Sequence, residues 1–234
     1  MDVSGKKVLL TGATGGLGEA VVRHFAEGGA QVAIVDRKSE PAPGSLDGLH
    51  DPLFIGDTDV TNPESVQRMA DQAVAAWGRI DVLVNMAGGW RGGMPIHETS
   101  VETWDFVMNL NAKSVFLVCR AVIPQMLKQE SGKIISVAAK SGLEGRAGTS
   151  VYNASKSAVI RLTESISAEV KDHGINVNCV LPTIIDTPAN RQQMPRSDFS
   201  KWVKPDAMAD VLVFLASDAA RAIHGAAIPV YGRV

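Results

Sequence analysis

Short apolar, β-branched segments alternate with longer amphipathic segments along almost the whole chain. The apolar segments predict strands at 7–12, 31–36, 52–60, 80–88, 132–139, 175–182 and 226–230. Helical spacing of the apolar positions predicts helices at 16–28, 63–77, 100–128, 150–172 and 205–217. Strands this apolar, alternating with helices, are typical of a parallel sheet whose two faces are both covered. The pattern therefore predicts an α/β fold with a doubly wound parallel sheet of about seven strands.

Two long segments lack this periodicity. Residues 38–51 are rich in Pro, Gly and Asp and are expected to form a surface loop. Residues 183–205 follow the sixth predicted strand, and ligands of such sheets bind beyond the carboxyl ends of the strands. We therefore expect 183–205 to be a loop over the substrate. No linker, repeat or low-complexity tract divides the sequence, so residues 1–234 are expected to form one domain.

The composition is that of an ordinary globular protein, with 45% hydrophobic and 21% charged residues. The net charge is −2 and the basic residues are scattered, so we expect neither a nucleic-acid partner nor a membrane partner. The apolar stretch near the N-terminus is too short for a signal peptide. Cys119 and Cys179 lie in apolar surroundings, which is typical of buried thiols. We expect a cytoplasmic protein without a metal site.

A glycine-rich segment, "TGATGGLG" (11–18), follows the first predicted strand and opens a helix. Glycines permit a tight turn close to a pyrophosphate, and the helix N-terminus supplies N–H donors. Asp36 ends the second strand, 20 residues after Gly16, where a carboxylate can accept both hydroxyls of an adenine ribose. Either feature alone also occurs as a simple turn or a helix cap. Together they predict a Rossmann-type dinucleotide-binding fold.

The expected cofactor is NADH, with NADPH as the alternative. The charge of Asp36 opposes a 2′-phosphate, whereas the guanidinium of Arg37 can pair with one. Asp59 and Val60, at the end of the third strand, are expected beside the adenine. Asn85 is interpreted either as a cofactor contact or as a strand-stabilising side chain. The expected cofactor-binding residues are Gly12, Thr14, Gly16, Leu17, Gly18, Asp36, Arg37, Asp59, Val60, Asn85, Ala87, Gly88, Tyr152, Lys156, Pro182 and Thr183.

Tyr152 and Lys156 lie one helical turn apart on one face of the predicted helix 150–172. A phenol has an unperturbed pKa of about 10, and a nearby ammonium and a positive nicotinamide ring favour its ionised form. Such a pair can move a proton near neutral pH. On an isolated helix the pair is ordinary, but behind a dinucleotide site it indicates a hydride-transfer enzyme.

The glycine-rich segment, Asp36, "NMAG" (85–88), "NLNAKSVF" and "YNASK" resemble the short-chain dehydrogenase/reductase family over almost the whole chain. The resemblance implies that Tyr152 is the acid–base catalyst and that Lys156 lowers its pKa and binds the nicotinamide ribose. It also implies that Asn111 holds a water between Lys156 and solvent, and that the protein is a homodimer or homotetramer. We expect the subunits to pack through the long helices 100–128 and 150–172.

This chain departs from the family pattern at Met86 and, more seriously, at Ala139. Most members carry a serine at the position of Ala139, and the hydroxyl of that serine donates to the substrate carbonyl. Loss of such a donor costs a few kcal/mol of transition-state stabilisation. Ser136 and Ser141 lie nearby in the sequence, and Ser141 is the candidate to replace the missing group.

Three stretches resemble the dihydropteridine reductase branch of the family: "AGGWRGG" (87–93), "AKSGLEG" (139–145) and "LPTIIDTPANRQQMPRSDFSKW" (181–202). Hydride addition to a quinonoid dihydropterin spreads charge over ring nitrogens, so a single oxyanion donor matters less. Trp90 is expected either as an aromatic wall or as a loop anchor. Asn111 departs from the branch, because a bulky aromatic is expected near that point in the animal enzymes. The expected substrate-pocket residues are Trp90, Ala139, Ser141, Pro188, Asn190 and Met194.

The sequence therefore predicts an NAD(P)H-dependent oxidoreductase that reduces a small, planar, pterin-like substrate. One alternative is a carbonyl or alcohol oxidoreductase of the 3-oxoacyl or sugar-alcohol type, in which water or Ser141 fills the role of the serine. Another is a dinucleotide-binding protein that has lost catalysis. Retention of both Tyr152 and Lys156 argues against the latter.

Overall fold

The computed structural model describes residues 1–234 and is built on one seven-stranded sheet in which every neighbouring pair is parallel. The strands are β1 (Lys7–Thr11), β2 (Gln31–Val35), β3 (Leu53–Ile55), β4 (Val82–Asn85), β5 (Gly132–Val137), β6 (Ile175–Pro182) and β7 (Ala227–Val230). Their order is β3-β2-β1-β4-β5-β6-β7, so the direction of winding reverses between β1 and β4. The predicted doubly wound Rossmann-type fold is confirmed.

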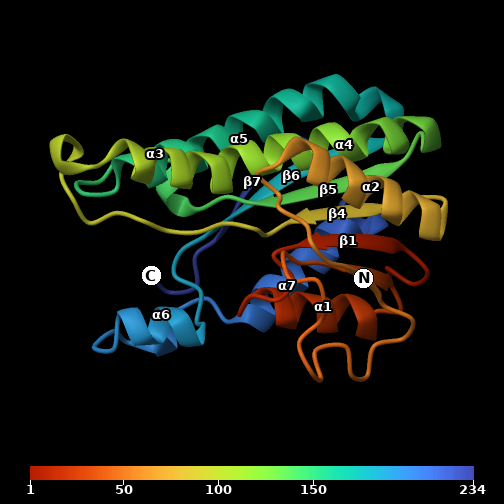
Figure 1. Ribbon diagram of the computed structural model, residues 1–234, viewed down its shortest axis with the longest axis horizontal. Coiled ribbons are helices and arrows are strands. Elements are labelled where there is room, and N and C mark those ends of the chain that lie inside the picture. Colours follow the sequence, from red (N-terminus) through yellow and green to blue (C-terminus); the bar gives the residue numbers. More distant parts are fainter.

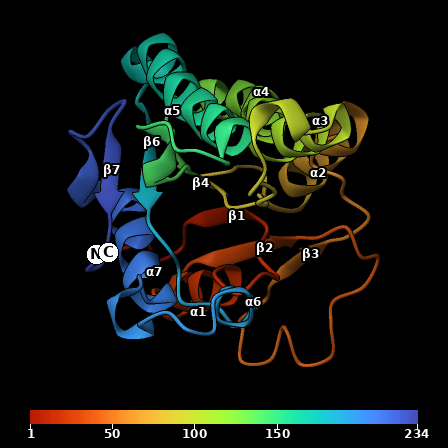
Figure 2. The same ribbon diagram turned by 90° about the vertical axis from the view of Figure 1, so that its left-hand side faces the viewer.

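Helices cover both faces of the sheet (Figures 1 and 2). They are α1 (Gly18–Glu27), α2 (Pro63–Trp77), α3 (Val101–Met108), α4 (Ser114–Gln129), α5 (Ser150–Val170), α6 (Pro188–Gln193) and α7 (Pro205–Ala216). Figure 2 shows α2, α4 and α5 on one side of the sheet, and α1 and α7 on the other. Short 3-10 turns occupy Ile96–Glu98, Lys140–Gly142, Lys171–His173, Phe199–Lys201 and Asp218–Ala220.

Alternate residues of each strand enter two separate cores. Leu9, Leu83 and Ile134 pack toward α2, α4 and α5, whereas Leu10 and Val84 pack toward α1 and α7. All eight residues of β6 are buried. Burial on both faces explains why these strands appear in the sequence as continuous apolar runs.

Local signals explain why α2 matches its prediction to the residue. Asn62 caps its first turn by accepting from the Ser65 N–H at 2.8 Å, and Pro63 opens the helix. Gly78 ends it in a left-handed conformation, with φ of 71°. The other strands and helices differ from their predicted bounds mostly at the ends, where capping residues are weaker signals.

The prediction of one α-helix over 100–128 is wrong in its middle. A π-helical turn at Asn109–Lys113 separates α3 from α4. The extra residue in this turn rotates the following helix and changes which side chains face inward. By length and composition, Val101–Gln129 could cross a membrane, but 50% of its most apolar window is buried in the protein. A core helix of a soluble protein meets the same criterion.

The segment 183–205 is also more ordered than its sequence suggests. It contains α6, capped by the Thr187 side chain and begun by Pro188, and a 3-10 turn at Phe199–Lys201. A single parallel bridge joins Ile185 to Val203, so the segment leaves the sheet and returns to it. Figure 1 shows α6 below the sheet, beyond the end at which β6 finishes.

Candidate active site

Two positions of the glycine-rich loop after β1 have no room for a side chain. Gly12 has φ of 70°, and a Cβ there would lie 2.7 Å from the backbone nitrogen of Ala87. A Cβ on Gly18 would overlap the carbonyl oxygen of Ala13. The loop thus lies directly against the segment that follows β4, with the first turn of α1 behind it.

A cleft of about 650 Å³ lies at the carboxyl ends of β1 to β4. Ten of the residues expected to bind the cofactor line it: Gly12, Thr14, Gly16, Leu17, Gly18, Asp36, Arg37, Val60, Ala87 and Gly88. The remaining lining residues were not predicted from the sequence: Gly15, Val35, Thr58, Thr61, Met86, Phe106, Asn109 and Leu110. Phe106, Asn109 and Leu110 come from α3 and the π-helical turn, and no local motif marks them.

Asp36 ends β2 at the rim of this cleft. Partial burial would raise the pKa of its carboxyl, but hydrogen bonds from Thr14 and from the backbone of Lys38 and Arg37 outweigh burial and lower that pKa. The Lys38 N–H donates to the carboxylate at 3.0 Å. Asp36 is therefore ionised at neutral pH, as an acceptor for two ribose hydroxyls must be.

Six of the expected cofactor contacts do not line the cleft, and two of them, Asp59 and Asn85, are committed to hydrogen bonds within the protein. The carboxylate of Asp59 accepts from the Thr61 N–H at 2.8 Å and from its hydroxyl at 2.7 Å, so it fastens the turn before α2. Asn85 is buried and donates to the Ser136 hydroxyl across β4 and β5 at 3.2 Å. This bond favours the interpretation of Asn85 as a strand-stabilising side chain over a cofactor contact, although the Oδ1 atom of Asn85 has no hydrogen-bond partner.

The chemistry of the cleft fits a dinucleotide. Gly12 and Gly18 leave a bare backbone where a Cβ would otherwise stand, which suits a pyrophosphate. The ionised Asp36 stands where it can accept ribose hydroxyls, and Arg37 beside it is exposed and cationic. These residues would hold the adenosine and pyrophosphate portions of NAD(P).

Tyr152 and Lys156 in α5 lie between this cleft and a second cavity. The Lys156 Nζ lies 3.5 Å from the position of a Cβ on Gly88, which lines the cleft, and Tyr152 lines the second cavity. Lys156 is buried and donates to the Val137 carbonyl at 2.9 Å. Burial lowers the pKa of Lys156 to about 8 and raises the pKa of Tyr152 to about 12.

The expected lowering of the Tyr152 pKa by Lys156 is therefore not produced by the protein alone. The Lys156 ammonium lies 5.9 Å from the centre of the phenol ring, and one of its N–H groups donates to a backbone carbonyl. Desolvation of the phenolate therefore outweighs the attraction of the ammonium and sets the direction of the Tyr152 pKa shift. The Tyr152 hydroxyl makes no hydrogen bond within the protein. At neutral pH it consequently carries its proton, which is the form that a proton donor needs.

Asn111 occupies the π-helical turn and is 1% exposed. Its amide oxygen accepts from the Gly89 N–H at 2.9 Å, and its amide nitrogen donates to the Gly89 carbonyl and the Ser155 hydroxyl, both at 3.0 Å. These bonds tie the segment after β4 to α5, next to Lys156. A bridging water at Asn111, implied by the family resemblance, stays a prediction.

The second cavity, also of about 650 Å³, lies beyond β5 and β6. It is lined by five of the six expected substrate residues, namely Trp90, Ala139, Ser141, Asn190 and Met194, and by the expected cofactor residues Pro182 and Thr183. Charged groups that the sequence analysis did not assign to the pocket also line it, among them Lys140, Glu144 and Arg146. Pro188 does not: its ring faces Gly16 of the glycine-rich loop, because it begins α6 there.

Ala139 stands at the wall of this cavity together with Tyr152, in the place where a serine was expected. Two hydrogen bonds hold the loop that follows it against α5, from Ser157 to the Gly142 carbonyl at 2.7 Å and from Asn153 to the Glu144 carbonyl at 3.0 Å. Ser141 also lines the cavity, and no hydrogen bond within the protein restrains its hydroxyl. The loop is therefore in the expected position, but it presents a methyl group beside the phenol.

Three comparisons with known proteins agree with this geometry. The sequence profile of the short chain dehydrogenase family matches residues 6–198, and the chain belongs to that family. The 3-oxoacyl-(acyl-carrier-protein) reductase FabG of Thermotoga maritima is 35% identical, over 99% of this chain and 98% of its own length. The D-threitol dehydrogenase of Mycolicibacterium smegmatis is also 35% identical, over 98% and 93%.

Solved structures show the same likeness. The crystal structure of gox2181 has a TM-score of 0.93 and 32% identity, covering 99% of this chain and 96% of that one. The structure of ElxO with NADP bound has a TM-score of 0.91 and 28% identity, over 97% and 98%. The protein is thus an NAD(P)-dependent oxidoreductase of this family. None of these relatives is named as a dihydropteridine reductase.

One buried carboxylate anchors the segment 183–205, which is expected to lie over the substrate. Asp186, whose side chain is 4% exposed, accepts from Arg191 of α6 and from Lys204 just before α7. Hydrogen bonds from Arg191 and then Lys204 hold the pKa of Asp186 well below its usual range. The guanidinium of Arg191 also lies 4.8 Å from the Phe199 ring. Asp186 therefore joins both ends of the segment that carries Asn190 and Met194.

We expect Asp186→Asn to lower the free energy of unfolding by about 1–3 kcal/mol, because hydrogen bonds to a buried charge are lost, and to raise KM for the substrate more than KM for the cofactor. Since the pKa of Asp186 is depressed in the fold, its stabilisation is present above about pH 4 and is lost as the pH falls further. Denaturant titrations at several pH values measure this. Asp198→Asn, at an exposed cap, is the control; an equal effect there would contradict the anchoring role.

Proposed function

We propose that this protein is an NADH-dependent reductase of a small, flat, conjugated ring of the quinonoid dihydropterin kind. The observation that carries the proposal is the position of Ala139 in the substrate cavity beside Tyr152, where the side chain of residue 139 offers a methyl group and no hydroxyl to a localised oxyanion. A ring that spreads charge over several nitrogens needs such a donor less than a ketone does. Trp90, on the wall of the same cavity and 52% exposed, offers an aromatic surface to a ring.

The residues of the cofactor cleft would hold a reduced nicotinamide dinucleotide, which would supply the hydride and with it two electrons for the substrate ring. Tyr152 balances this charge by giving its phenolic proton to a ring nitrogen. The phenolate that remains is stabilised by the nearby ammonium of Lys156, which the Val137 carbonyl holds in place. Solvent then returns a proton to Tyr152. Retention of both groups in one geometry is the argument against a protein that only binds the dinucleotide.

A second candidate is reduction of a simple carbonyl, or oxidation of the corresponding alcohol. The names of the 3-oxoacyl reductase and the threitol dehydrogenase favour this class for these two relatives, and a shared substrate class would follow if their pockets and the pocket of this chain were alike. In that case Ser141, with an unrestrained hydroxyl in the cavity, would be the donor to the alkoxide. The two candidates differ in what a serine at position 139 would do.

We also propose that the protein is a homodimer or homotetramer that works in the cytoplasm on a small molecule. Phe116 on α4 and Trp104 on α3 are both 46% exposed. Large apolar side chains on the outer helices support burial against a second subunit.

Cofactor choice is the first prediction of this proposal. The protein should bind NADH at least about 10-fold more tightly than NADPH, because the ionised carboxylate of Asp36 would repel the 2′-phosphate of NADPH. Asp36→Ser should narrow or reverse that ratio, and Arg37→Ala should widen it. Fluorescence titration with both cofactors measures the ratios. Tighter binding of NADPH by the unaltered protein would show that Arg37 dominates and that the NADH assignment is wrong.

The proton donor gives the second prediction. Tyr152→Phe removes the hydroxyl and should lower kcat by about 100-fold or more while cofactor affinity stays within about twofold. Tyr231→Phe, at the other tyrosine of the chain, is the matched control and should retain activity. An undiminished rate for Tyr152→Phe would move the proton source to water or to Lys140.

The third prediction separates the two substrate classes. On a quinonoid dihydropterin, Ala139→Ser should change kcat/KM by less than about threefold, because no localised oxyanion forms. On simple ketones the same variant should be faster by about 10-fold or more, since the new hydroxyl can donate to the developing alkoxide. The measurement is a pair of steady-state rates on each substrate, with Ala138→Ser as the control for added bulk.

Fast ketone reduction by the unaltered protein would contradict the pterin proposal. It would also require a donor other than residue 139. Ser141→Ala should then abolish most of that activity, whereas it should leave a pterin reaction nearly unchanged.

A further inference from the structure

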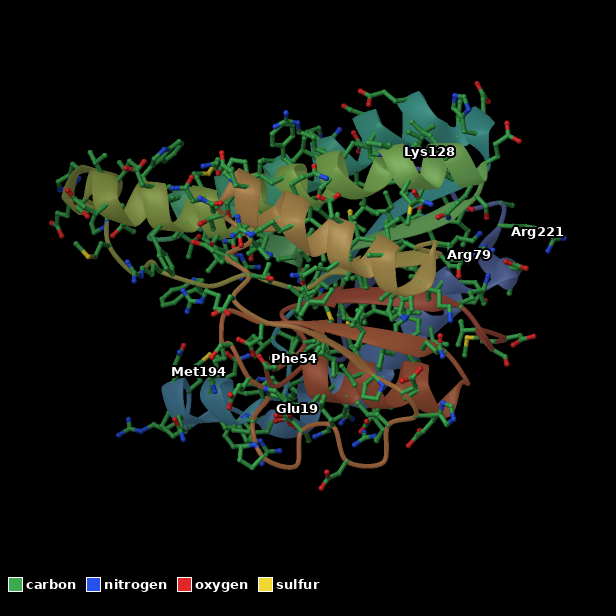
Figure 3. All side chains as sticks on the ribbon, turned by 45° about the vertical axis from the view of Figure 1, so that its right-hand side comes forward. Glu19, Phe54, Arg79, Lys128, Met194 and Arg221 are labelled. Atoms are coloured by element: carbon green, nitrogen blue, oxygen red, sulfur yellow. The ribbon has the colours of Figure 1, made fainter.

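A third cavity, of about 330 Å³, lies at the opposite end of the sheet from the active site, at the amino ends of the strands. No hydrophobic side chain lines it, and it shares no residue with the cofactor cleft or the substrate cavity. Figure 3 shows two of its residues, Arg79 and Arg221, at one end of the molecule and Met194 of the substrate cavity at the other. None of the residues assigned to the cofactor, the substrate or proton transfer lines this cavity.

Its walls carry an excess of positive charge. Five lysines and arginines line the cavity against two aspartates. Both aspartates are already paired, Asp218 with Lys6 at 3.4 Å and Asp81 with Arg79. Three cations around the cavity have no carboxylate within ion-pair distance: Lys133, Lys171 and Arg221. In a chain with a net charge of −2, this concentration is not explained by composition.

The centre of the cluster is a buried lysine. Lys133 in β5 is 8% exposed, and its ammonium donates to the Asn176 amide oxygen at 2.6 Å. Asn176 in β6 is 5% exposed, and its amide nitrogen donates to the carbonyls of Arg221 and Ile223 at 2.9 and 3.0 Å. Those two bonds fix the amide so that its oxygen faces Lys133.

An ammonium has three N–H donors, and only one of those on Lys133 has an acceptor within the protein, the Asn176 amide oxygen. A buried charge is costly unless it meets an opposite charge or a full set of hydrogen bonds. The remaining donors of Lys133 therefore call for an acceptor in the cavity. Arg221 and Lys171, both exposed at its mouth, bring two further cations from different elements.

We propose that this cavity binds a small oxyanion of the phosphate class, either inorganic phosphate or a phosphoryl group. A phosphate offers several acceptor oxygens to donors that converge from different directions, and guanidinium and ammonium groups are its usual ligands. The absence of apolar walls disfavours a ring or an alkyl chain. A bound anion would connect β5, β6 and the segment before β7, so it would stabilise the fold without touching the reacting groups.

Thermal unfolding of the whole chain in phosphate and in chloride, at equal ionic strength and pH, tests the proposal. Phosphate at about 100 times its Kd should raise the midpoint by about 5–10 °C, because it binds only the folded state. Lys133→Met and Arg221→Ala should each weaken phosphate affinity, measured by calorimetry, by about 10-fold or more. Arg221 is exposed, so its variant keeps the test valid if Lys133→Met does not fold.

Two control variants locate the effect. Lys128→Ala removes an exposed cation at the same end of the molecule but outside the cavity, and Arg37→Ala removes one from the cofactor cleft. Both should bind phosphate like the unaltered protein. The proposal is wrong if phosphate gives no shift, if Arg221→Ala keeps full affinity, or if Arg37→Ala loses it. An equal shift in acetate would replace the phosphate assignment with a carboxylate.

Discussion

The candidate active site depends on one buried charge, the ammonium of Lys156, which has no carboxylate partner and is held by the Val137 carbonyl at 2.9 Å. That bond is made between the last residue of β5 and a side chain of α5, so strand and helix must keep one relative position. The Asn111 amide adds a second tie, from the π-helical turn to α5 through Ser155. An unpaired ammonium in this position favours negative charge nearby, which is what a reacting phenol develops.

The parallel sheet brings the rest of the site to this point. Because all seven strands run in one direction, the loops after β1, β2, β4, β5 and β6 meet at a single edge. The loops after β1 to β4 contribute to the cofactor cleft, and the loops after β4, β5 and β6 contribute to the substrate cavity, with Tyr152 and Lys156 between them. The basic cavity lies at the other edge, so an anion bound there would act through the strands rather than through the substrate.

Patterns local in sequence predicted most of the fold and pointed to the candidate reacting groups. Apolar runs located the strands, and the spacing of Tyr152 and Lys156 placed both on one helix face. Properties that depend on side-chain direction were not predictable. The Asp59 carboxylate accepts from Thr61, and the Pro188 ring lies against Gly16. No local sequence pattern indicates either of these side-chain directions. The π-helical turn and the high pKa of Tyr152 arise from packing between distant segments, which a single sequence does not display.

On this geometry Tyr152 is a protonated acid in the protein, and its anion becomes accessible only with a positive charge close by. The chain has two tyrosines, so in Tyr231→Phe an ultraviolet titration of phenolate reports Tyr152 alone. We expect a pKa of about 12 for Tyr152 in the protein alone, and a pKa at least about 1 unit lower when NAD⁺ saturates the cleft. A pKa near the ordinary value of about 10 without NAD⁺, or one that NAD⁺ leaves unchanged, would contradict it.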